Sequence, residues 1–372
     1  MKVFQFVSYS QESHYFANLG KGLSEKGIGV SYGTLFEIGR EKPEWMKLID
    51  NTNYVCLNAK SKKDFPLAVL KLAKILRSEK IDILQTHLYE ASFVGMLAAK
   101  LARTPLKILT RHHLDQAHLI GNKVPIAIDR WEAQTADKVV TLSNAVREFL
   151  MSDGIDAEKI EVIYQGFDFE SFSADENDRK RIRKEFGLTE GDFVIGTIGN
   201  FFPTKGHRFL VSAAKELLNK IPNLKLFFVG ESGDMKTLKK QIAELGLTDK
   251  VIFAGFRKDV NACMKAVDTV VHPSLSEAFC QVLIETMSVG TPLISTDVGG
   301  AKEVITDGES GWLIPAENVE AIVKAIGKVY NNRESSQEIA LVGQKSVRAR
   351  FTVEKMVNRQ VECYEDWLEE KK

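Results

Sequence analysis

The sequence predicts an α/β protein made of two domains in series, each built around a parallel sheet. Three observations support this. Short apolar runs alternate with amphipathic helical stretches, and a polar, charged stretch at 164–192 interrupts the alternation once. The length of 372 residues suits two domains of ordinary size. Because open α/β sheets and domain interfaces both favour ligand sites, we expect a ligand-binding cleft between the two domains.

The first half of the chain contains strand-like runs separated by helical stretches. The stretch 66–80 begins with Pro66 at a first helical position and carries apolar residues at a helical period. Short connections between the runs favour parallel pairing. The expected elements are strands at 2–8, 81–87, 107–113 and 138–143 and helices at 13–27, 66–80, 90–103 and 144–154.

The alternation restarts after the polar stretch. We expect strands at 193–199, 225–230, 251–255, 269–274, 292–296 and 311–315, with helices at 206–220 and 234–245, one around Glu285, and a last one at 352–371. The predicted domains are therefore 1–170 and 171–351, followed by a C-terminal helix at 352–372.

Composition excludes several functional classes. The 50 basic and 50 acidic residues balance, so the overall charge gives no reason to expect a nucleic-acid partner. The four cysteines form no C-x-x-C pair, which argues against structural zinc and a disulfide framework. The first ten residues are typical of a strand rather than a signal peptide, and no run of about 18 apolar residues predicts a membrane span. We expect a cytoplasmic protein with reduced thiols.

Charge is concentrated locally. From Lys60 to Arg111 there are 11 Lys and Arg against 4 Asp and Glu, an excess of +7. One interpretation is a solvated helix face. The other is a weak peripheral contact with the inner face of the cell membrane or with a phosphate-bearing acceptor.

Two carboxylates stand out in the apolar segment "HPSLSEAFCQVLIETMSVGTPLIS", residues 272–295. Glu277 follows a strand, and we expect it at a helix N-terminus, either in a capping box with Ser274 or facing a ligand. Glu285 lies inside the expected helix among apolar residues, and helical spacing would place it on the same broad side as Glu277. A carboxylate there suits two hydroxyl hydrogen bonds, as from a ribose, or is satisfied by its own protein neighbours.

Two further segments can bind phosphate or sugar. In "GTIGNFFPTKGH", residues 196–207, a strand ends at Gly199 and Lys205 precedes a helix, a combination that suits a diphosphate but also describes a surface lysine. Neither a P-loop nor a G-x-G-x-x-G fingerprint is present. Gly299-Gly300 makes either a turn or a close backbone approach.

Three histidines lie at predicted strand ends: His87, His112 and His113. They are either structural or act as hydrogen-bonding and acid–base groups. No metal-ligand spacing accompanies them.

Together these segments resemble retaining glycosyltransferases of the GT-B fold, family 4, whose E-x7-E signature matches "SEAFCQVLIETMSVGTPLISTDVGGAKEVITDGESGWLIP". Blocks such as "IGNFFPTKGH", "LFFVGESGD", "KVIFAGFRKDV" and "ADKVVTLSNAVREFL" follow the family's order. The resemblance implies two Rossmann-like α/β domains facing each other across a cleft, with the last helix crossing back to the first domain. It also implies a nucleoside-diphosphate sugar donor, usually a UDP-sugar, no other cofactor and no bound metal.

The resemblance also implies roles for individual residues. Lys205 matches the lysine that binds the diphosphate, Glu285 the glutamate that binds the ribose, and Glu277 the glutamate at the donor sugar. His112 matches the first-domain histidine that faces the sugar, with His113 as the alternative one residue away. Further donor-binding positions are Gly199, Asn200, Ala278, Phe279, Cys280 and Arg257.

The expected reaction is transfer of a hexose, with retention, to a glycan or lipid-linked acceptor. Asn200 stands where the family commonly has Arg, and Arg208 or Arg257 could compensate for the missing charge. "SYSQESHYF" replaces the glycine-rich first loop. These departures keep two alternatives open: a sugar-nucleotide epimerase of the same fold, and a non-catalytic nucleotide-sugar-binding subunit.

Overall fold

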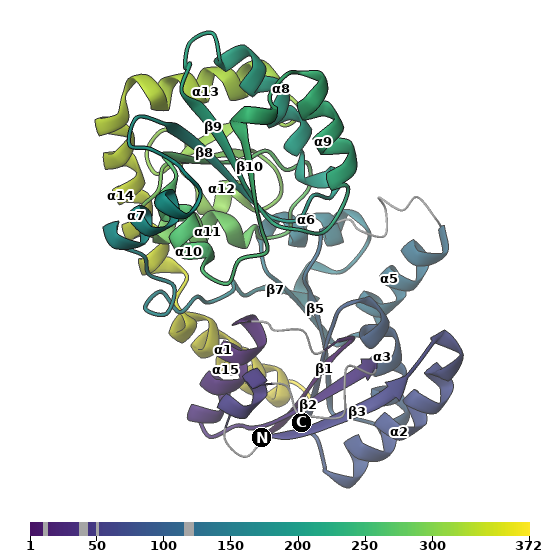
Figure 1. Ribbon diagram of the computed structural model, residues 1–372. Helices are drawn as coiled ribbons and strands as arrows, with labels where there is room; N and C mark the ends of the chain where they lie inside the picture. The colour runs from purple at the N-terminus through teal and green to yellow at the C-terminus, as the bar shows by residue number, and fades with distance from the viewer. Residues whose placement is uncertain (10–13, 37–43, 50–51, 115–122) are drawn as a thin grey trace. The chain divides into compact units, whose positions relative to one another are not determined.

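The computed structural model describes residues 1–9, 14–36, 44–49, 52–114 and 123–372. These residues divide into two compact units. Unit 1 comprises Met1–Asp168 together with Phe351–Lys372, and unit 2 comprises Phe169–Arg350. Each unit is an α/β structure around a parallel sheet, as the sequence predicts (Figure 1).

The sheet of unit 1 has the strand order β3-β2-β1-β4-β5-β6-β7, and every described pairing is parallel. Its strands are β1 (Lys2–Val7), β2 (Gly29–Phe36), β3 (Asn53–Ala59), β4 (Ile83–His87), β5 (Leu106–Arg111), β6 (Lys138–Thr141) and β7 (Ile160–Val162). Its α-helices are α1 (His14–Glu25), α2 (Phe65–Ser78), α3 (Tyr89–Ala102), α5 (Lys123–Thr135), α6 (Asn144–Ser152) and α15 (Val353–Glu369). Short 3-10 turns are η1 (Glu44–Leu48), η2 (Lys62–Asp64) and η3 (Ala157–Lys159).

The strands β2 and β3 were not among the predicted elements. Gly29 and Gly33 interrupt the β2 sequence, and glycine is normally depleted in strands. In the folded chain Gly33 has a packing reason, since a Cβ there would lie 2.6 Å from the Phe4 ring. Packing against β1, rather than local propensity, therefore makes this segment a strand.

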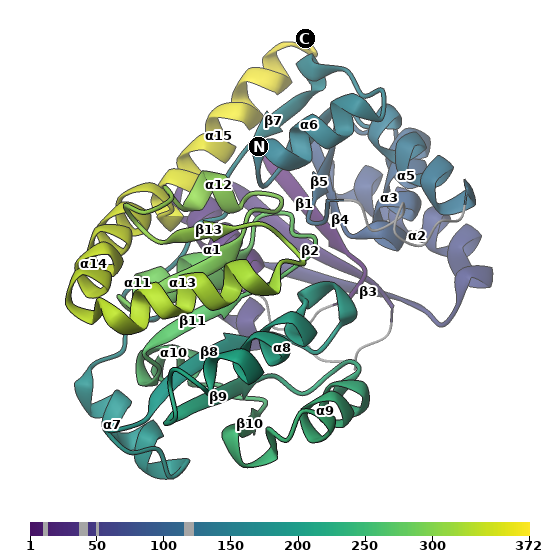
Figure 2. The same cartoon turned by 90° about the horizontal axis from the view of Figure 1, so that it is seen from above.

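The sheet of unit 2 has the order β10-β9-β8-β11-β12-β13, again parallel (Figure 2). Its strands are β8 (Phe193–Ile198), β9 (Leu224–Val229), β10 (Val251–Gly255), β11 (Thr269–His272), β12 (Leu293–Thr296) and β13 (Trp312–Ile314). Its α-helices are α7 (Glu176–Glu185), α8 (His207–Leu217), α9 (Met235–Glu244), α10 (Val260–Ala266), α11 (Gln281–Ser288), α12 (Ala301–Val304), α13 (Val319–Asn331) and α14 (Arg333–Arg350), with the 3-10 turns η4 (Pro203–Lys205) and η5 (Thr248–Lys250).

Burial explains why the second sheet forms. All six residues of β8 and all four of β11 are buried, as expected for central strands of a parallel sheet that has helices on both faces. The strand order reverses at the β8–β11 pair, because β9 follows β8 on one side and β12 follows β11 on the other. Such a reversal point is where open α/β sheets bind ligands, beyond the carboxyl ends of the strands.

The last helix, α15, belongs to unit 1 and packs against α1. Thr352 caps its N-terminus by accepting a hydrogen bond from the Lys355 amide at 3.2 Å. Its buried face includes Cys363, Tyr364 and Trp367. Within the described parts of the chain, the helices are all too short or too polar to span a membrane.

Candidate active site

Glu277 lies in the loop between β11 and α11, rather than at a helix N-terminus as predicted. The helix begins at Gln281, and its N-cap is Cys280. The capping-box interpretation with Ser274 is therefore wrong, because Glu277 precedes the helix by four residues. The helical-spacing argument that related Glu277 to Glu285 is wrong for the same reason.

Lys205 and His272 both contact one oxygen of Glu277. The Lys205 Nζ lies 2.6 Å from Glu277 Oε1, and the His272 Nε2 lies 2.9 Å from the same atom. The Glu277 side chain is 11% exposed, while those of Lys205 and His272 are 28% and 3% exposed. Burial opposes ionisation, but the hydrogen bond from His272 and the nearby charges outweigh it and lower the pKa of Glu277 to about 2. The carboxylate is therefore ionised at neutral pH.

Backbone contacts bring the lysine turn and the glutamate loop together. The Leu275 amide donates to the Thr204 carbonyl at 2.7 Å. Gly206 follows Lys205 with φ +67°, and a Cβ there would lie 1.9 Å from the Pro273 carbonyl oxygen. Only glycine combines this backbone conformation with so close an approach. The glycine in "TKGH" thus lets the turn pack against Pro273, and this packing fixes where the Lys205 ammonium group lies.

The glycine pair 299–300 supports the same loop from the other side. Gly299 has φ +53°, and a Cβ there would lie 1.8 Å from the Glu277 carbonyl oxygen. The Gly300 amide donates to the Ala278 carbonyl at 3.1 Å. The pair therefore makes a close backbone approach to the glutamate loop as well as a turn.

Glu285 occupies the middle of α11 and is half-buried. Among the residues that the structure describes, no group hydrogen-bonds or pairs with its carboxylate. Burial raises the pKa of Glu285 to about 7. A half-buried acceptor without a protein partner is suited to bind hydroxyl groups of a ligand.

The residues between the two glutamates are largely buried. Ala278, Phe279 and Cys280 are 9%, 2% and 6% exposed. Cys280 has φ +62°, a left-handed conformation that is costly for a residue with a side chain. The strained residue lies immediately before α11 and turns the chain from the Glu277 loop into the helix.

One set of groups has the composition of a metal site. The ligand atoms of His272, Glu277 and Cys280 all lie within 4.8 Å of one another. Two features oppose a cation there. The Lys205 ammonium already contacts Glu277, and burial followed by the Glu277 charge raises the pKa of the Cys280 thiol well above its usual value. A neutral thiol and a competing ammonium do not suit a metal ion.

The predicted residues Gly199 and Asn200 follow β8. Gly199 has φ +140°, and its carbonyl oxygen would lie 2.3 Å from a Cβ on Gly230. The Asn200 Oδ1 accepts a hydrogen bond from the Ser232 amide at 3.3 Å. Asn200 therefore links the loops that follow β8 and β9. An arginine in its place could not accept this hydrogen bond, because a guanidinium group only donates.

Arg257 follows β10, an edge strand, and is held by two carboxylates. Its guanidinium pairs with Glu185 at 2.6 Å and with Asp259 at 2.8 Å, and stacks over the Phe186 ring. Hydrogen bonds to Asp259 and then Glu185 raise its pKa. None of the described contacts joins Arg257 to Lys205 or Glu277. The structure thus leaves its predicted donor-binding role without geometric support.

In unit 1, His112 follows β5 and lies beside His87 at the end of β4. The His112 Nε2 and His87 Nδ1 are 2.9 Å apart. Burial lowers the pKa of His112 to about 4 and that of His113 to about 3. The neighbouring Arg111 forms a buried ion pair with Asp129, which is a structural role.

His272 is the site residue that the sequence interpretation missed. It is the last residue of β11 and the first residue of the segment "HPSLSE". The sequence did contain a signal for His272. It is a histidine at the carboxyl end of a central parallel strand, five residues before an acidic residue. Its contact with Glu277 depends on the path of the intervening loop, which the sequence pattern alone does not give.

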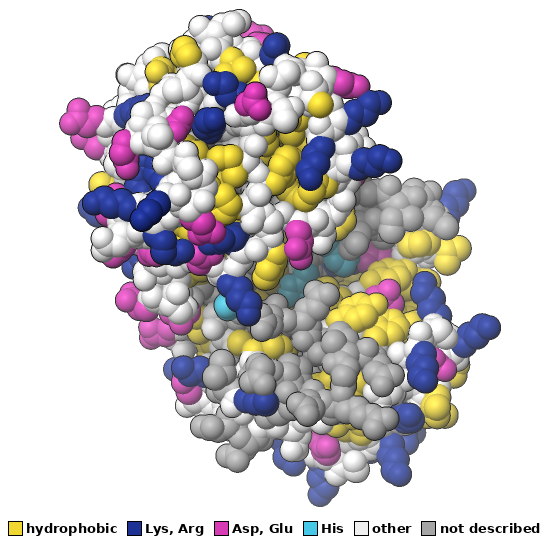
Figure 3. Space-filling view, viewed as in Figure 1, with side chains coloured by type: hydrophobic (Ala, Val, Ile, Leu, Met, Phe, Trp, Pro, Cys, Tyr) yellow, Lys and Arg dark blue, Asp and Glu magenta, His cyan; other side chains and the backbone are white. Residues whose placement is uncertain are grey.

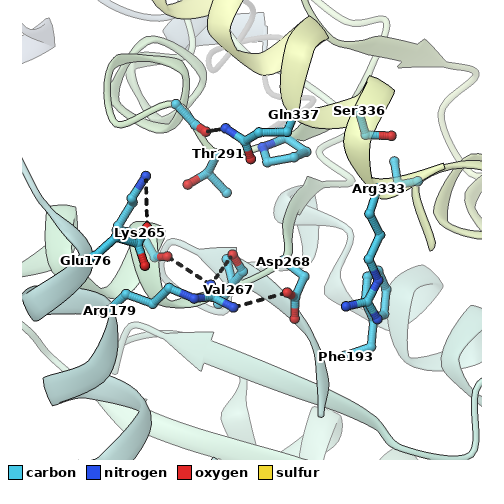
Figure 4. A pocket seen from close by; sticks show the side chains of 13 residues that line it. Glu176, Arg179, Phe193, Lys265, Val267, Asp268, Thr291, Arg333, Ser336 and Gln337 are labelled. Atoms are coloured by element: carbon cyan, nitrogen blue, oxygen red, sulfur yellow. Dashed lines mark hydrogen bonds and ion pairs between the residues drawn. The ribbon is translucent and has the colours of Figure 1, made fainter. Parts of the chain in front are cut away.

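A separate cavity of about 220 Å³ lies in unit 2 (Figure 4). Phe193, Asp268 and Pro292 line it at the amino ends of β8, β11 and β12, whereas Glu277 follows the carboxyl end of β11. The cavity's charged groups on α7, on α10 and at the start of β11 are paired by protein atoms, while Arg333 lies over the Phe193 and Tyr330 rings. Arg179 contacts Asp268 at 3.2 Å and three backbone carbonyls, and Lys265 contacts Glu176 at 3.7 Å. These pairs join α7 to α10 and to the start of β11, so we assign the cluster a structural role.

Two family descriptions match almost the whole chain. "Glycosyltransferase Family 4" matches residues 13–171, and "Glycosyl transferases group 1" matches residues 178–345. The D-inositol 3-phosphate glycosyltransferase of Nocardia farcinica is 30% identical over 305 residues, which are 75% of this chain and 67% of the relative. The chain belongs to glycosyltransferase family 4. This membership supports a glycosyltransferase over the epimerase and the non-catalytic subunit.

Other similarities agree with this family 4 assignment. The UDP-Gal:alpha-D-GlcNAc-diphosphoundecaprenol alpha-1,3-galactosyltransferase of Escherichia coli is 27% identical over 286 residues, 75% of this chain and 74% of the relative. The crystal structure of Anabaena HepE in complex with UDP superposes with a TM-score of 0.85 at 24% identity, covering 98% of this chain and 100% of HepE. The family 4 enzyme described here therefore has the predicted GT-B fold, with two Rossmann-like α/β domains.

Proposed function

We propose that this glycosyltransferase moves a hexose from a UDP-sugar to a glycan or lipid-linked acceptor, with retention of the anomeric configuration. The choice of UDP rests on relatives. The Escherichia coli enzyme is named for UDP-Gal and a diphosphoundecaprenol acceptor, and HepE has been crystallised with UDP-glucose. Retention follows from the family resemblance.

The observation that carries the proposal is the Lys205–Glu277–His272 arrangement at the reversal point of the unit 2 sheet. Negative charge develops on the departing diphosphate during transfer, and a fixed ammonium group would stabilise it. Lys205 is the proposed diphosphate ligand. Glu277 keeps one oxygen engaged by Lys205 and His272, so we assign its other oxygen to a hydroxyl of the donor sugar.

The remaining donor contacts are assigned from position. Glu285, with a carboxylate that lacks a described protein partner, is the proposed ribose ligand. Gly199, Asn200, Ala278, Phe279 and Cys280 would border the diphosphate and sugar, and His112 would hydrogen-bond the sugar. Arg257 is the weakest of the assignments, because two carboxylates already hold it.

We further propose that transfer needs no divalent metal. The Lys205 ammonium would supply positive charge at the diphosphate, and its contact with Glu277 opposes a cation on that carboxylate. Adding EDTA should therefore leave turnover unchanged. Loss of turnover in EDTA, restored by Mg²⁺ or Mn²⁺, would contradict this part of the proposal.

A peripheral membrane contact through α2 is proposed as the route to a lipid-linked acceptor. Leu67 and Leu70 on this helix are 56% and 59% exposed, and Lys71 and Lys74 are exposed near them. Lys and Arg side chains gather along the edge of unit 1 where α2 lies (Figure 3). Apolar residues flanked by lysines are typical of helices that lie on anionic membranes.

The test of function is an assay with separate UDP-glucose, UDP-galactose and UDP-N-acetylglucosamine donors and a panel of saccharide and lipid-linked saccharide acceptors. We expect one donor to give a glycoside whose anomeric configuration, read from the proton coupling constant, equals that of the donor. An inverted product would contradict retention. Release of free sugar alone, with every acceptor, would contradict transfer to these acceptor classes.

A further inference from the structure

A chain of buried polar side chains runs through the centre of unit 1, from His112 to Tyr364 on α15. The His112 Nε2 lies 2.9 Å from His87 Nδ1, and the His87 Nε2 lies 2.6 Å from Gln5 Oε1. The Gln5 Nε2 donates to the Tyr364 hydroxyl at 3.1 Å. His87, Gln5 and Tyr364 are each 0% exposed. Buried polar groups are costly unless fully hydrogen-bonded, so a chain of this length needs a reason.

The hydrogen-bonding partners assign the protons on both imidazoles. Burial lowers the pKa of His87 well below its usual value and that of His112 to about 4, so both rings are neutral near pH 7. The amide oxygen of Gln5 only accepts, and His87 Nε2 must therefore carry the hydrogen. The His87 Nδ1 then has a lone pair, so His112 donates from Nε2. This leaves His112 Nδ1 as an acceptor.

The orientation of the Gln5 amide decides this outcome, and on the side away from His87 its partners are Gln85 and, on the C-terminal helix, Tyr364. The two hydrogens of Gln5 Nε2 reach the Tyr364 hydroxyl and the Gln85 Oε1, the latter at 3.2 Å. The Tyr364 hydroxyl in turn donates to Gln85 Oε1. Both acceptors face the same side of Gln5, so its oxygen is turned toward His87. Reversing the Gln5 amide would require the Gln85 amide and the Tyr364 hydroxyl to reverse as well.

Aromatic rings fix the positions of the two imidazoles. Phe16 makes edge contacts with His87 and His112, with ring centroids 4.8 and 5.9 Å apart, and Tyr15 makes one with His112 at 5.1 Å. The rings are held in place by packing, while the hydrogen-bond chain selects which nitrogen carries the proton. Only His112 of the pair is half-buried rather than buried, so it is the end of the chain that a ligand can reach.

We propose that Tyr364, acting through Gln5 and His87, is a positioning residue that holds His112 in the Nε2–H tautomer and so presents Nδ1 as a hydrogen-bond acceptor to a hydroxyl of the donor sugar. The contact with sugar rests on the proposed function, whereas the tautomer does not. The C-terminal helix thereby gains a role in substrate binding in addition to packing. A sugar derivative that lacks the donating hydroxyl would lose this contact.

The tautomer is measured directly in the ligand-free protein by two-bond ¹H–¹⁵N correlation spectra of ¹⁵N-histidine-labelled full-length chain at neutral pH. The His112 signals are assigned by comparison with His112→Asn. We expect a lone-pair (pyridine-like) shift at Nδ1 and a protonated (pyrrole-like) shift at Nε2 for His112. A protonated Nδ1 on His112 would overturn the proposal, whatever the activity of the enzyme.

The role of the helix is tested with Tyr364→Phe, which removes one hydroxyl from the chain. Tyr32→Phe is the matched control, since Tyr32 is also 0% exposed and its hydroxyl donates to the Phe16 carbonyl at 2.8 Å, outside the chain. We expect Tyr364→Phe to give mixed tautomer signals for His112 and to lower kcat/KM for the donor about tenfold, the effect of one hydrogen bond. The control should keep the single tautomer and the wild-type kcat/KM.

Two results would count against the proposal. A Tyr364→Phe variant with an unchanged His112 tautomer and the control's kcat/KM would show that the α15 hydroxyl does not determine which nitrogen of His112 carries the hydrogen. Full transfer activity in His112→Asn would show that His112 makes no important contact with the sugar. It would contradict the part of the proposal that concerns substrate binding. In neither case would the transferase activity itself be in question.

Discussion

Lys205 and His272 approach the same oxygen of Glu277, at 2.6 and 2.9 Å. One cation and one imidazole on a single carboxylate oxygen leave the other oxygen available to a ligand. The arrangement also ties two loops together, one after β8 and one after β11.

Glu277→Gln keeps the shape of the side chain but removes its charge. The charge-assisted bonds from Lys205 and His272 weaken, and both partners lose their orientation. Because misplacing reacting groups by about 1 Å can cost a factor of about 100, we expect kcat to fall about 100-fold. Steady-state assays with the preferred UDP-sugar measure this. Glu309→Gln, an exposed glutamate of the same unit, is the control and should keep wild-type kcat.

Glu285 should make donor binding pH-dependent, because burial raises its pKa to about 7. The ionised carboxylate accepts hydroxyl hydrogen bonds, so affinity for UDP-glucose should rise by up to about tenfold from pH 6 to pH 8. Titration calorimetry across this range measures the change. Glu285→Gln should bind with a flat pH profile, and an equally steep profile in that variant would contradict the assignment.

The same raised pKa predicts the pH dependence of stability. A group with a raised folded-state pKa contributes stability that is present below its unfolded pKa of about 4.5 and lost as pH rises through about 7. The wild type should therefore lose more unfolding free energy between pH 5 and pH 8 than Glu285→Gln does. Urea unfolding at several pH values compares them, and parallel curves would argue against a perturbed Glu285.

Gly299→Ala should disturb the Glu277 loop. The added Cβ would lie 1.8 Å from the Glu277 carbonyl oxygen, at a backbone φ of +53°. We expect a loss of roughly 3 kcal/mol in unfolding free energy together with reduced kcat. Gly308→Ala is the matched control. It has φ +75° but no atom within 4 Å of the new Cβ, so it should cost about 1 kcal/mol and leave kcat unchanged.

Leu67→Glu with Leu70→Glu tests the membrane contact. Both side chains are more than half exposed on α2, so the folded state should be little affected. Wild type should pellet with anionic liposomes at low salt and less so at high salt, because the lysine contribution is screened. The double variant should remain in the supernatant. Equal pelleting of both proteins would exclude this face of α2 as the contact.

The sequence predicted the parallel α/β architecture because short runs rich in apolar residues, such as β8 and β11, alternate with helical stretches. It missed β2, where Gly29 and Gly33 conceal a strand that tertiary packing stabilises. It named Glu277 and Lys205 through their motif, yet placed Glu277 at a helix N-terminus, whereas α11 begins four residues later at Gln281. The left-handed Cys280 delays the start of α11, and a residue pattern does not report such a backbone conformation.

His272 was missed because its role depends on the loop geometry. Asn200 was named from its motif, but its bond to the Ser232 amide, which joins two loops 32 residues apart in sequence, was not predicted. The network from His112 to Tyr364 joins the end of β5 to the last helix. Contacts between such distant segments cannot be read from local periodicity.

A thermal-shift comparison of wild type and Lys205→Ala tests whether unit 2 holds a UDP-sugar through Lys205. The ligands are UDP, GDP, ADP and their sugars, all in EDTA. The exposed, ion-paired Lys302→Ala is the control. A ligand at about 100 times its Kd adds roughly 2.7 kcal/mol of stability. We expect a selective shift with uridine ligands in the wild type and in Lys302→Ala, and a much smaller one in Lys205→Ala. An equal shift in Lys205→Ala, or a shift only with guanosine or adenosine ligands, would contradict it.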